Sequence, residues 1–235
     1  MWGGAESTNC VSPSALCARI AHWYDPLSRM MTLGYDLRWR QIAADLARVP
    51  ASGCVLDAGT GTGDMALALL SRWPEITVVG MDLAPEMMHV GRQKPGAVHI
   101  CWMQGDGLHL PFPSAHFDAV VSAFLLRNVA DVPSALAEQR RVVRPGGRVV
   151  CLELTWPRTP GFRTLFRIYF AGLLPLINGI LSGHHAPFRY LPRSVQRFMA
   201  PEEVQAQMER AGLRNVSYRT LALGTVAVHV GERGR

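Results

Sequence analysis

The chain has 235 residues, of which 49% are hydrophobic and 18% are charged, so it can bury a sizeable core and we expect a single folded domain. Its net charge of +6 comes with arginines that are scattered along the sequence, and the lack of a basic run argues against a nucleic-acid partner. The five cysteines show no CxxC or metal-ligand spacing and the N-terminus shows no secretory signal; we therefore expect reduced thiols, no metal and a cytoplasmic protein.

The first two thirds of the chain predict helices and then strands that alternate with helices. Apolar residues have helical spacing from about Cys17 to Val49. The strands predicted after them are "CVLDAG", "ITVVGMDL", "VHICWMQGD", "FDAVVSAF" and "RVVCLEL", the last preceded by an "RPGG" turn. Helices are predicted between them at "MALALLSRW", "PEMMHVGRQ" and residues 133–143. Strands that are apolar throughout and alternate with helices are typical of a parallel sheet covered on both faces.

The regular alternation stops after Glu153. A proline-punctuated, aromatic-rich insertion follows, then the helix "PEEVQAQMERAG" and two closing strands, "RNVSYRTLAL" and "TVAVHVGE". The chain therefore predicts an α/β fold: a doubly wound, mostly parallel seven-stranded sheet with a helical N-terminal extension and a helical insertion before the last two strands.

The stretch "LDAGTGTGD" follows the first predicted strand, which is where an open parallel sheet binds its ligand. Gly59, Gly61 and Gly63 give G-x-G-x-G, whereas a dinucleotide-binding loop has G-x-G-x-x-G, whose third glycine would fall at Asp64. An acid at Asp57 would also repel a pyrophosphate. The loop therefore predicts a cationic ligand, an adenosine with a sulfonium and an amino acid tail, lying close to the backbone.

Two further acids end the next predicted strands. Asp82 follows the second strand and can accept hydrogen bonds from ribose hydroxyls, a feature that an NAD site would share. Asp106 follows the third strand, where its carboxylate can accept from an adenine amino group or else cap its own loop. Acids at three successive strand ends together favour a nucleoside site more strongly than any one of them.

This constellation resembles the class I S-adenosylmethionine-dependent methyltransferases, which have a Rossmann-like fold. Three longer stretches are similar to the UbiE/COQ5 family, the C-methyltransferases of menaquinone and ubiquinone biosynthesis. They are "RIAHWYDPLSRMMTLGYDLRWR", "LPFPSAHFDAVVSAFLLRNVAD" and "RVVRPGGRVVCLELT". The likeness runs from about Arg19 to Gly231. It departs at Ala123, where the family has Ser, and at Leu125, where the family has Gly. In the first stretch Ser28, Thr32 and Asp36 stand where the family has Asn, Ser and His.

The resemblance implies S-adenosyl-L-methionine as the cofactor and a ring carbon of a demethylmenaquinol or related quinol as the methyl acceptor. It divides the chain into an extension or lid (1–49), a cofactor-binding half (50–155), a substrate-side insertion (156–199) and a C-terminal helix with its strand pair (200–235). From the loop, the strand ends and the resemblance together, the predicted cofactor contacts are Tyr24, Asp57, Gly59, Gly61, Thr62, Gly63, Asp82, Leu83, Asp106, Gly107 and Ala123.

Methyl transfer to a quinol carbon needs a donor at the phenolate oxygen that develops on the ring. Arg127 suits this task and Asn128 can orient the ring oxygen or a water, so both are the predicted catalytic residues. The alternative for Arg127 is a salt bridge to Asp131 or another surface acid. Tyr190 and Ser194 are predicted to line the substrate site, with packing as their alternative role.

The insertion at 160–199 predicts a peripheral contact with the inner face of a membrane. Its apolar character suits an isoprenoid-tailed quinol drawn from the bilayer, and its arginines can face lipid phosphates. The alternative is a helical pair that buries its apolar face on the domain. A homodimer is left open. Three other functions also stay open: methylation of another small aromatic or lipid-like acceptor, an NAD-linked oxidoreductase, and a cofactor-binding domain without catalysis.

Overall fold

A computed structural model describes residues 13–173 and 186–235. Over these residues, seven strands form one sheet in the order β3-β2-β1-β4-β5-β7-β6. The first five strands are parallel, and β7 is antiparallel to both of its neighbours. This confirms the predicted α/β fold with a mostly parallel sheet. The strands are β1 (Cys54–Ala58), β2 (Thr77–Asp82), β3 (Ile100–Gln104), β4 (Phe117–Ala123), β5 (Val143–Leu154), β6 (Leu213–Leu221) and β7 (Val226–Arg233).

The strand order reverses beside β1. Asp57 at the centre of the sheet pairs with Gly80 of β2 on one side and with Val121 of β4 on the other. The connections that leave β1 and β4 therefore run to opposite sides, and a crevice opens at the carboxyl ends of these strands. This crevice is where the glycine-rich loop lies.

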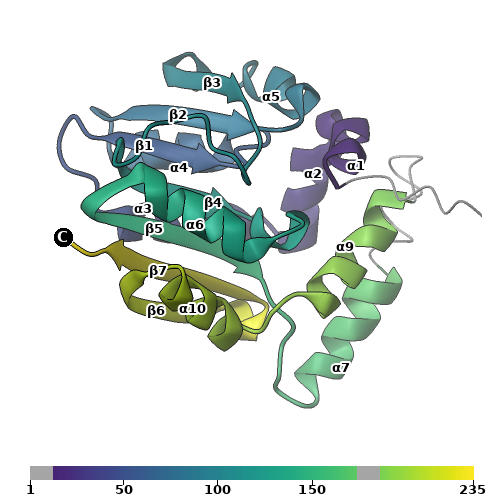
Figure 1. The fold of residues 1–235 in the computed structure, drawn as a ribbon. Helices are drawn as coiled ribbons and strands as arrows, with labels where there is room; N and C mark the ends of the chain where they lie inside the picture. The colour runs from purple at the N-terminus through teal and green to yellow at the C-terminus, as the bar shows by residue number, and fades with distance from the viewer. Residues whose placement is uncertain (1–12, 174–185) are drawn as a thin grey trace, which may run out of the picture.

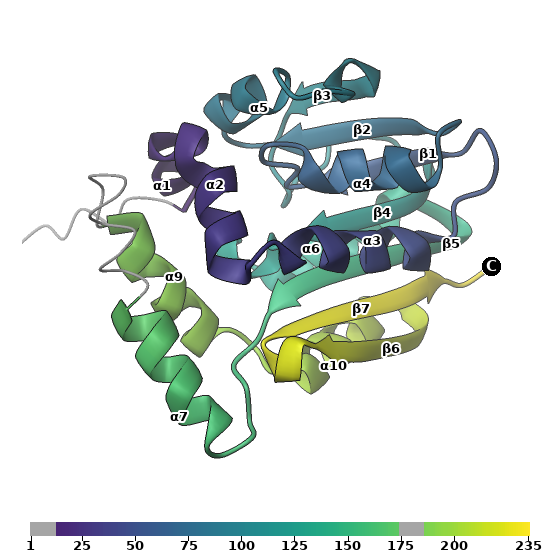
Figure 2. The same cartoon turned by 180° about the vertical axis from the view of Figure 1, so that it is seen from behind.

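Helices cover both faces of the sheet (Figures 1 and 2). One face is covered by α3 (Tyr35–Ala47) and α4 (Asp64–Arg72), and the other by α6 (Val132–Val142) and α10 (Pro201–Arg210). Beyond the carboxyl ends of the parallel strands lie α1 (Pro13–Arg19), α2 (Ala21–Thr32), α7 (Phe162–Arg167) and α9 (Ala186–Arg197). The remaining elements are α5 (Pro85–Gly91), η1 (Ala97–His99), η2 (Leu126–Asn128), the π-helical turn η3 (Ile168–Leu173) and η4 (Ala222–Gly224).

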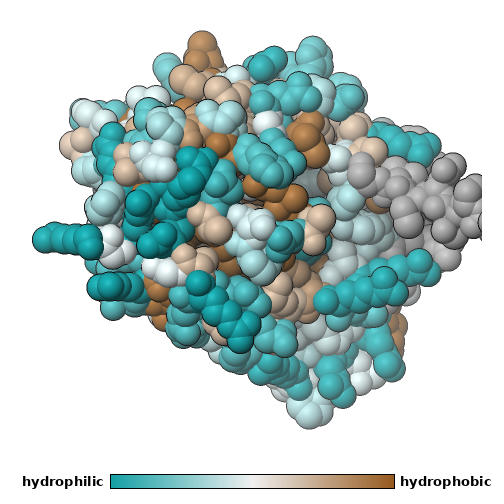
Figure 3. Space-filling model, viewed as in Figure 1, coloured by the Kyte–Doolittle hydropathy of each residue, from teal (hydrophilic) through white to brown (hydrophobic). Residues whose placement is uncertain are grey.

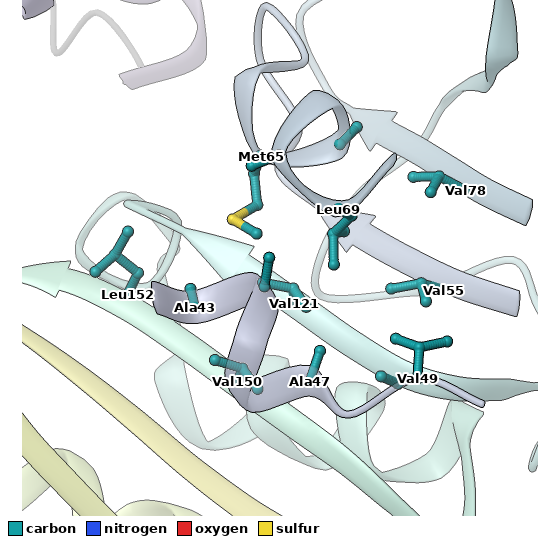
Figure 4. Close-up of a cluster of buried hydrophobic side chains, with 14 of the residues drawn as sticks. Ala43, Ala47, Val49, Val55, Met65, Leu69, Val78, Val121, Val150 and Leu152 are labelled. Carbon is teal, nitrogen blue, oxygen red and sulfur yellow. The ribbon is translucent and has the colours of Figure 1, made fainter. Parts of the chain in front are cut away.

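The core under α3 and α4 explains why these two segments form helices against the sheet (Figure 4). Ala43 and Ala47 recur one helical turn apart on α3 and are buried, and their small side chains let the helix approach the strands closely. Met65 and Leu69 are likewise buried and one helical turn apart on α4. These side chains pack on the valines of the central strands, and their burial fixes α3 and α4 on this face.

Two local predictions change. The helical pattern before residue 50 forms three helices: α1 ends at Arg19, and α2 ends where Leu33 and Gly34 take positive φ angles of 52° and 78°. The expected "RPGG" turn instead lies inside β5, which begins at Val143 and bulges against β4. Glycine is needed there because a Cβ on Gly147 would lie 2.5 Å from the Asp118 carbonyl oxygen.

The face that carries α6 and α10 is mainly hydrophilic, with hydrophobic side chains showing only in small groups (Figure 3). Among the helices of the described residues, none is long and apolar enough to cross a membrane.

Candidate active site

A cleft of about 280 Å³ opens at the carboxyl ends of β1, β2 and β4, and we call it the strand-end cleft. Its walls come from the glycine-rich loop, the ends of these strands, α1, α2 and the segment after β3. The predicted cofactor residues that line it are Tyr24, Gly59, Gly61, Asp82, Leu83, Asp106, Gly107 and Ala123. The fold thus gathers residues from positions 24 to 123 around one cavity.

Asp82 connects the loop to the end of β2. Its Oδ2 accepts a hydrogen bond of 2.7 Å from the Gly61 N–H and its Oδ1 accepts one of 2.8 Å from the Ala84 N–H. Burial raises the pKa of this half-buried carboxyl group above its usual value. Gly61 has a φ of +54°, which the loop needs in order to present that N–H. Asp82 is therefore fixed at the wall of the cleft.

Three predicted cofactor residues do not line this cleft. Asp57 is fully buried, and its Oδ2 accepts a 2.6 Å hydrogen bond from the Thr60 hydroxyl. Burial raises the pKa of Asp57 to about 7. The Thr62 hydroxyl donates to Asp25 at 2.6 Å, and Gly63 lies against the Trp102 ring. These residues support the loop from within. We expected Asp57 to contact a cation directly, and its buried placement does not favour that contact.

A smaller cavity of about 30 Å³ adjoins the loop, and Thr62 lines it together with Tyr24, Gly59, Gly61 and Ala123. Four of these residues also line the strand-end cleft. The two spaces therefore share the loop as a wall.

Asp106 lies at the far wall of the cleft with its side chain about half exposed. Its Oδ1 accepts a 2.9 Å hydrogen bond from the Leu108 N–H, so it caps its own loop, and it still lines the cavity. The described residues that line the cleft include two aspartates and no Arg, Lys or His. A pyrophosphate would find no cationic side chain here, whereas a nucleoside that lacks phosphate fits the available acceptors.

A second cavity of about 100 Å³, which we call the inner chamber, adjoins the strand-end cleft. Apolar side chains from α1, α2, α3, β5 and α9 form most of its wall. The two cavities share Cys17, Tyr24, Phe124 and Asn128. A molecule in one cavity therefore meets a molecule in the other at this common wall.

Arg127 lines the inner chamber and is nearly buried. Its Nη1 donates to Glu153 Oε2 at 3.0 Å and to the Phe124 carbonyl at 2.8 Å. Its Nε–H is buried and has no partner among the described residues. Glu153 Oε1 also accepts a 2.6 Å hydrogen bond from the Leu126 N–H, and burial raises the pKa of Glu153. Arg127 therefore does form a salt bridge, but its partner is the buried Glu153 on β5 and not a surface acid, while Asp131 caps α6.

Asn128 is held from two sides. Its Nδ2 donates to the Phe124 carbonyl at 2.8 Å, and its Oδ1 accepts a 3.1 Å hydrogen bond from the Tyr190 hydroxyl. Phe124 has a φ of +63°, a left-handed conformation that is strained for a residue with a side chain. In this conformation the Phe124 carbonyl accepts hydrogen bonds from both Arg127 and Asn128, and so it orients the two side chains.

Of the two residues predicted to line the substrate site, Tyr190 lies in the wall of the inner chamber and Ser194 does not. The Ser194 hydroxyl donates to the Leu191 carbonyl at 2.9 Å within α9, and Ser194 lines neither the strand-end cleft nor the smaller cavity.

Ionic contacts fasten α2 to the glycine-rich loop. Lys94, the one lysine in the sequence, lies 2.5 Å from Asp25 on α2 and 2.6 Å from Asp64 at the start of α4. Arg29 on α2 also pairs with Asp64 at 2.6 Å. Sequence reasoning named Tyr24 and Asp64 but did not foresee these ion pairs, whose partners are 30 to 69 positions apart in the sequence.

The sheet order, the glycine-rich loop and a cleft for a nucleoside without phosphate define a Rossmann-like methyltransferase. The fold is that of a Haemonchus contortus phosphoethanolamine N-methyltransferase solved with S-adenosylhomocysteine. That structure has a TM-score of 0.68 and 12% identity, over 96% of this chain and 61% of the other. The model of the ubiE/COQ5 methyltransferase family matches residues 11–233, and the chain belongs to this family.

Curated relatives agree with the family assignment. A demethylmenaquinone methyltransferase of Thermus thermophilus is 46% identical over 92% of this chain and 99% of its own length. A ubiquinone/menaquinone biosynthesis C-methyltransferase UbiE of Geobacter sulfurreducens is 39% identical over 92% of this chain and 86% of its own length. The predicted family and the predicted methyltransferase activity are confirmed.

Proposed function

We propose that the protein binds S-adenosylmethionine in the strand-end cleft and methylates a ring carbon of a demethylmenaquinol, or a related quinol, in the inner chamber. The observation that carries this proposal is the common wall of the two cavities. One cavity offers acceptors for a nucleoside, the other is apolar with a few polar groups, and they meet at Tyr24, Phe124 and Asn128.

In the cleft, Asp82 would accept hydrogen bonds from the ribose hydroxyls and Asp106 from the adenine amino group. Leu83 and Gly107 would form the walls beside them. Bound there, S-adenosylmethionine supplies a methyl group on a sulfonium. Asp57 and Gly63 would keep the loop in shape from behind the cleft, and Thr62 would line the smaller cavity beside the bound molecule.

In the inner chamber, Arg127 would stabilise the negative charge that develops on a ring oxygen when a hydroquinone hydroxyl gives its proton to a water molecule. Asn128, fixed by Tyr190 and by the Phe124 carbonyl, would orient the ring. The apolar walls would exclude water, which strengthens each of these interactions. The charge on the ring oxygen raises the electron density of the neighbouring carbon, which is the atom that accepts the methyl group.

The printed activities of the relatives support a quinol acceptor. Two departures from the family pattern, Ala123 and Leu125, lie at the strand-end cleft, and Leu125 packs against Gly59. The other three, Ser28, Thr32 and Asp36, line the inner chamber, so the departures touch the walls of both cavities. The loop has Asp64 where a dinucleotide-binding loop has its third glycine, which speaks against an NAD-linked oxidoreductase.

We also propose a peripheral contact with the inner membrane face through residues 160–199, of which 174–185 lie outside the described residues. Exposed arginines at 163, 167 and 193 would meet lipid phosphates. Phe170 on η3 and Val195 on α9 are buried in one cluster. Part of the apolar surface of the insertion therefore packs on the protein, as expected for a helical pair that buries its apolar face on the domain. Sedimentation with anionic liposomes tests the contact. Equal binding by the wild type and by Arg167→Glu/Arg193→Glu would remove it.

The test of the proposed function has two stages. Calorimetry with S-adenosylhomocysteine and with NADH should show binding of the first only. Transfer of a labelled methyl group is then measured on a panel of quinols and other small aromatic acceptors. Transfer to carbon of a naphthoquinol supports the proposal, and transfer only to acceptors outside the quinols would overturn it.

A further inference from the structure

A buried arginine lies between the inner chamber and the smaller cavity beside the glycine-rich loop. Arg40 on α3 lines both cavities. Its Nη1 donates to Asp36 Oδ2 at 2.8 Å, and its guanidinium lies 5.2 Å from the centre of the Phe124 ring. Its Nε–H is buried and has no partner among the described residues. Because buried donors are nearly always paired, this group is available to a bound molecule.

The surroundings of Arg40 favour a further negative charge. Burial lowers the pKa of Arg40, because water does not reach the guanidinium. Its carboxylate partner is shared, since Arg29 also pairs with Asp36. The other acid nearby, Asp64, already pairs with Lys94 and with Arg29. A carboxylate placed beside Arg40 would therefore complete the compensation of its charge.

The smaller cavity has the size and the polarity for one end of an amino acid. Its volume of about 30 Å³ gives room for a single small polar group. Arg40 and Asp64 are the charged side chains among the described residues of its wall, and much of the rest is the glycine-rich loop. The same loop borders the strand-end cleft, so a molecule in the cleft can extend such a group past the loop toward Arg40.

We propose that Arg40 binds the carboxylate of the methionine part of S-adenosylmethionine, an inference that rests on the proposed function. With the nucleoside held at Asp82 and Asp106, the Nε–H of Arg40 would donate a charge-assisted hydrogen bond to this carboxylate. The strand-end cleft itself offers the carboxylate no cationic side chain among its described residues. Arg40 would thus serve the cofactor, while Arg127, whose guanidinium also contacts the Phe124 ring, would serve the acceptor.

The test is calorimetry with two ligands that differ only in this group. They are S-adenosylhomocysteine and its decarboxylated form, which keeps the nucleoside and the amine but lacks the carboxylate. Arg40→Met should weaken S-adenosylhomocysteine binding about tenfold to a hundredfold, as expected for the loss of a charged hydrogen-bond donor. It should not weaken binding of the decarboxylated form. The control is Arg38→Met, an exposed arginine on the same helix, which should change neither affinity.

Arg40→Met removes one partner of the buried Asp36, so circular dichroism first checks that the variant is folded. If it is not, Arg40→Met/Asp36→Asn, which removes the pair together, is measured instead and should show the same selective loss. Equal weakening of both ligands, or no weakening of S-adenosylhomocysteine, would overturn the proposal. The result does not depend on the acceptor. A selective loss would support the role of Arg40 even if no quinol were methylated, a result that would remove only the proposed function.

Discussion

Replacing Arg127 by Ala should reduce both stability and turnover, for two separate reasons. The change leaves Glu153 buried without its ion-pair partner, and breaking a buried pair in this way costs about 3–5 kcal/mol of unfolding free energy. It also removes the donor that we place at the developing phenolate, which should lower kcat by roughly a hundredfold or more. Binding of S-adenosylhomocysteine should change little, because Arg127 does not line the strand-end cleft.

The loss of stability should depend on pH in a defined direction. Burial already raises the pKa of Glu153 above 4.5, and Arg127 opposes this rise. Without Arg127 the pKa rises further, so the folded variant holds a proton that the unfolded chain releases. Stability therefore falls as pH increases above about 4.5. The variant should be closest to the wild type near pH 5 and furthest from it near pH 8.

Urea unfolding followed by circular dichroism at pH 5 and pH 8 measures this effect. Arg144→Ala is the matched control, because Arg144 pairs with Asp118 at 2.8 Å on the surface, where such pairs contribute about 0–1 kcal/mol. The double variant Arg127→Ala/Glu153→Gln should lose the pH dependence. Equal destabilisation by Arg127→Ala and Arg144→Ala, or wild-type turnover by Arg127→Ala, would refute the reasoning.

Three further predictions concern the loop and its supports. Asp82→Asn should weaken S-adenosylhomocysteine binding, measured by calorimetry, by about tenfold to a hundredfold, since a hydrogen bond to a charged group contributes about 1.5–3 kcal/mol. The surface change Glu75→Gln should have no effect. Asp57→Asn should gain stability relative to the wild type as pH rises from about 3.8 to about 7. In this range Asp57 ionises in the unfolded chain but keeps its proton in the folded protein, so the wild type loses stability and the Asn variant does not. Parallel pH profiles in urea unfolding would contradict this. Asp25→Asn should speed acetylation of Lys94, because Lys94 is only 18% exposed within its ion pairs. Peptide mass spectrometry measures the rate. The same rate in Asp25→Asn and in the surface control Asp45→Asn would show that the ion pair with Asp25 does not limit access to Lys94.

Much of the fold followed from local pattern. Apolar runs of strand length alternate with helical spacing, and these periods determine which face of each element is buried. Acids at the carboxyl ends of neighbouring parallel strands lie at the same edge of the sheet. Asp82 and Asp106 therefore reach one cleft, as their positions in the sequence indicate.

Orientation within the site was decided by tertiary packing. Asp57 follows the same rule of position as Asp82, yet it is turned into the protein because the loop folds back and the Thr60 hydroxyl closes on it. Arg127 selects Glu153 and not Asp131, since β4 and β5 lie side by side and bring an acid 26 positions away into contact. Sequence distance carries no information on such choices.

The sequence by itself determined the family, the sheet and the residues that form the loop and strand ends, because these depend on periodicity and on short motifs. Only the tertiary structure decided which groups are buried, which ion pairs close α2 over the loop, and that Arg40 lies between two cavities. These features depend on the relative placement of whole elements. That placement is set by the packing of all the core side chains together, which no single stretch of the chain encodes.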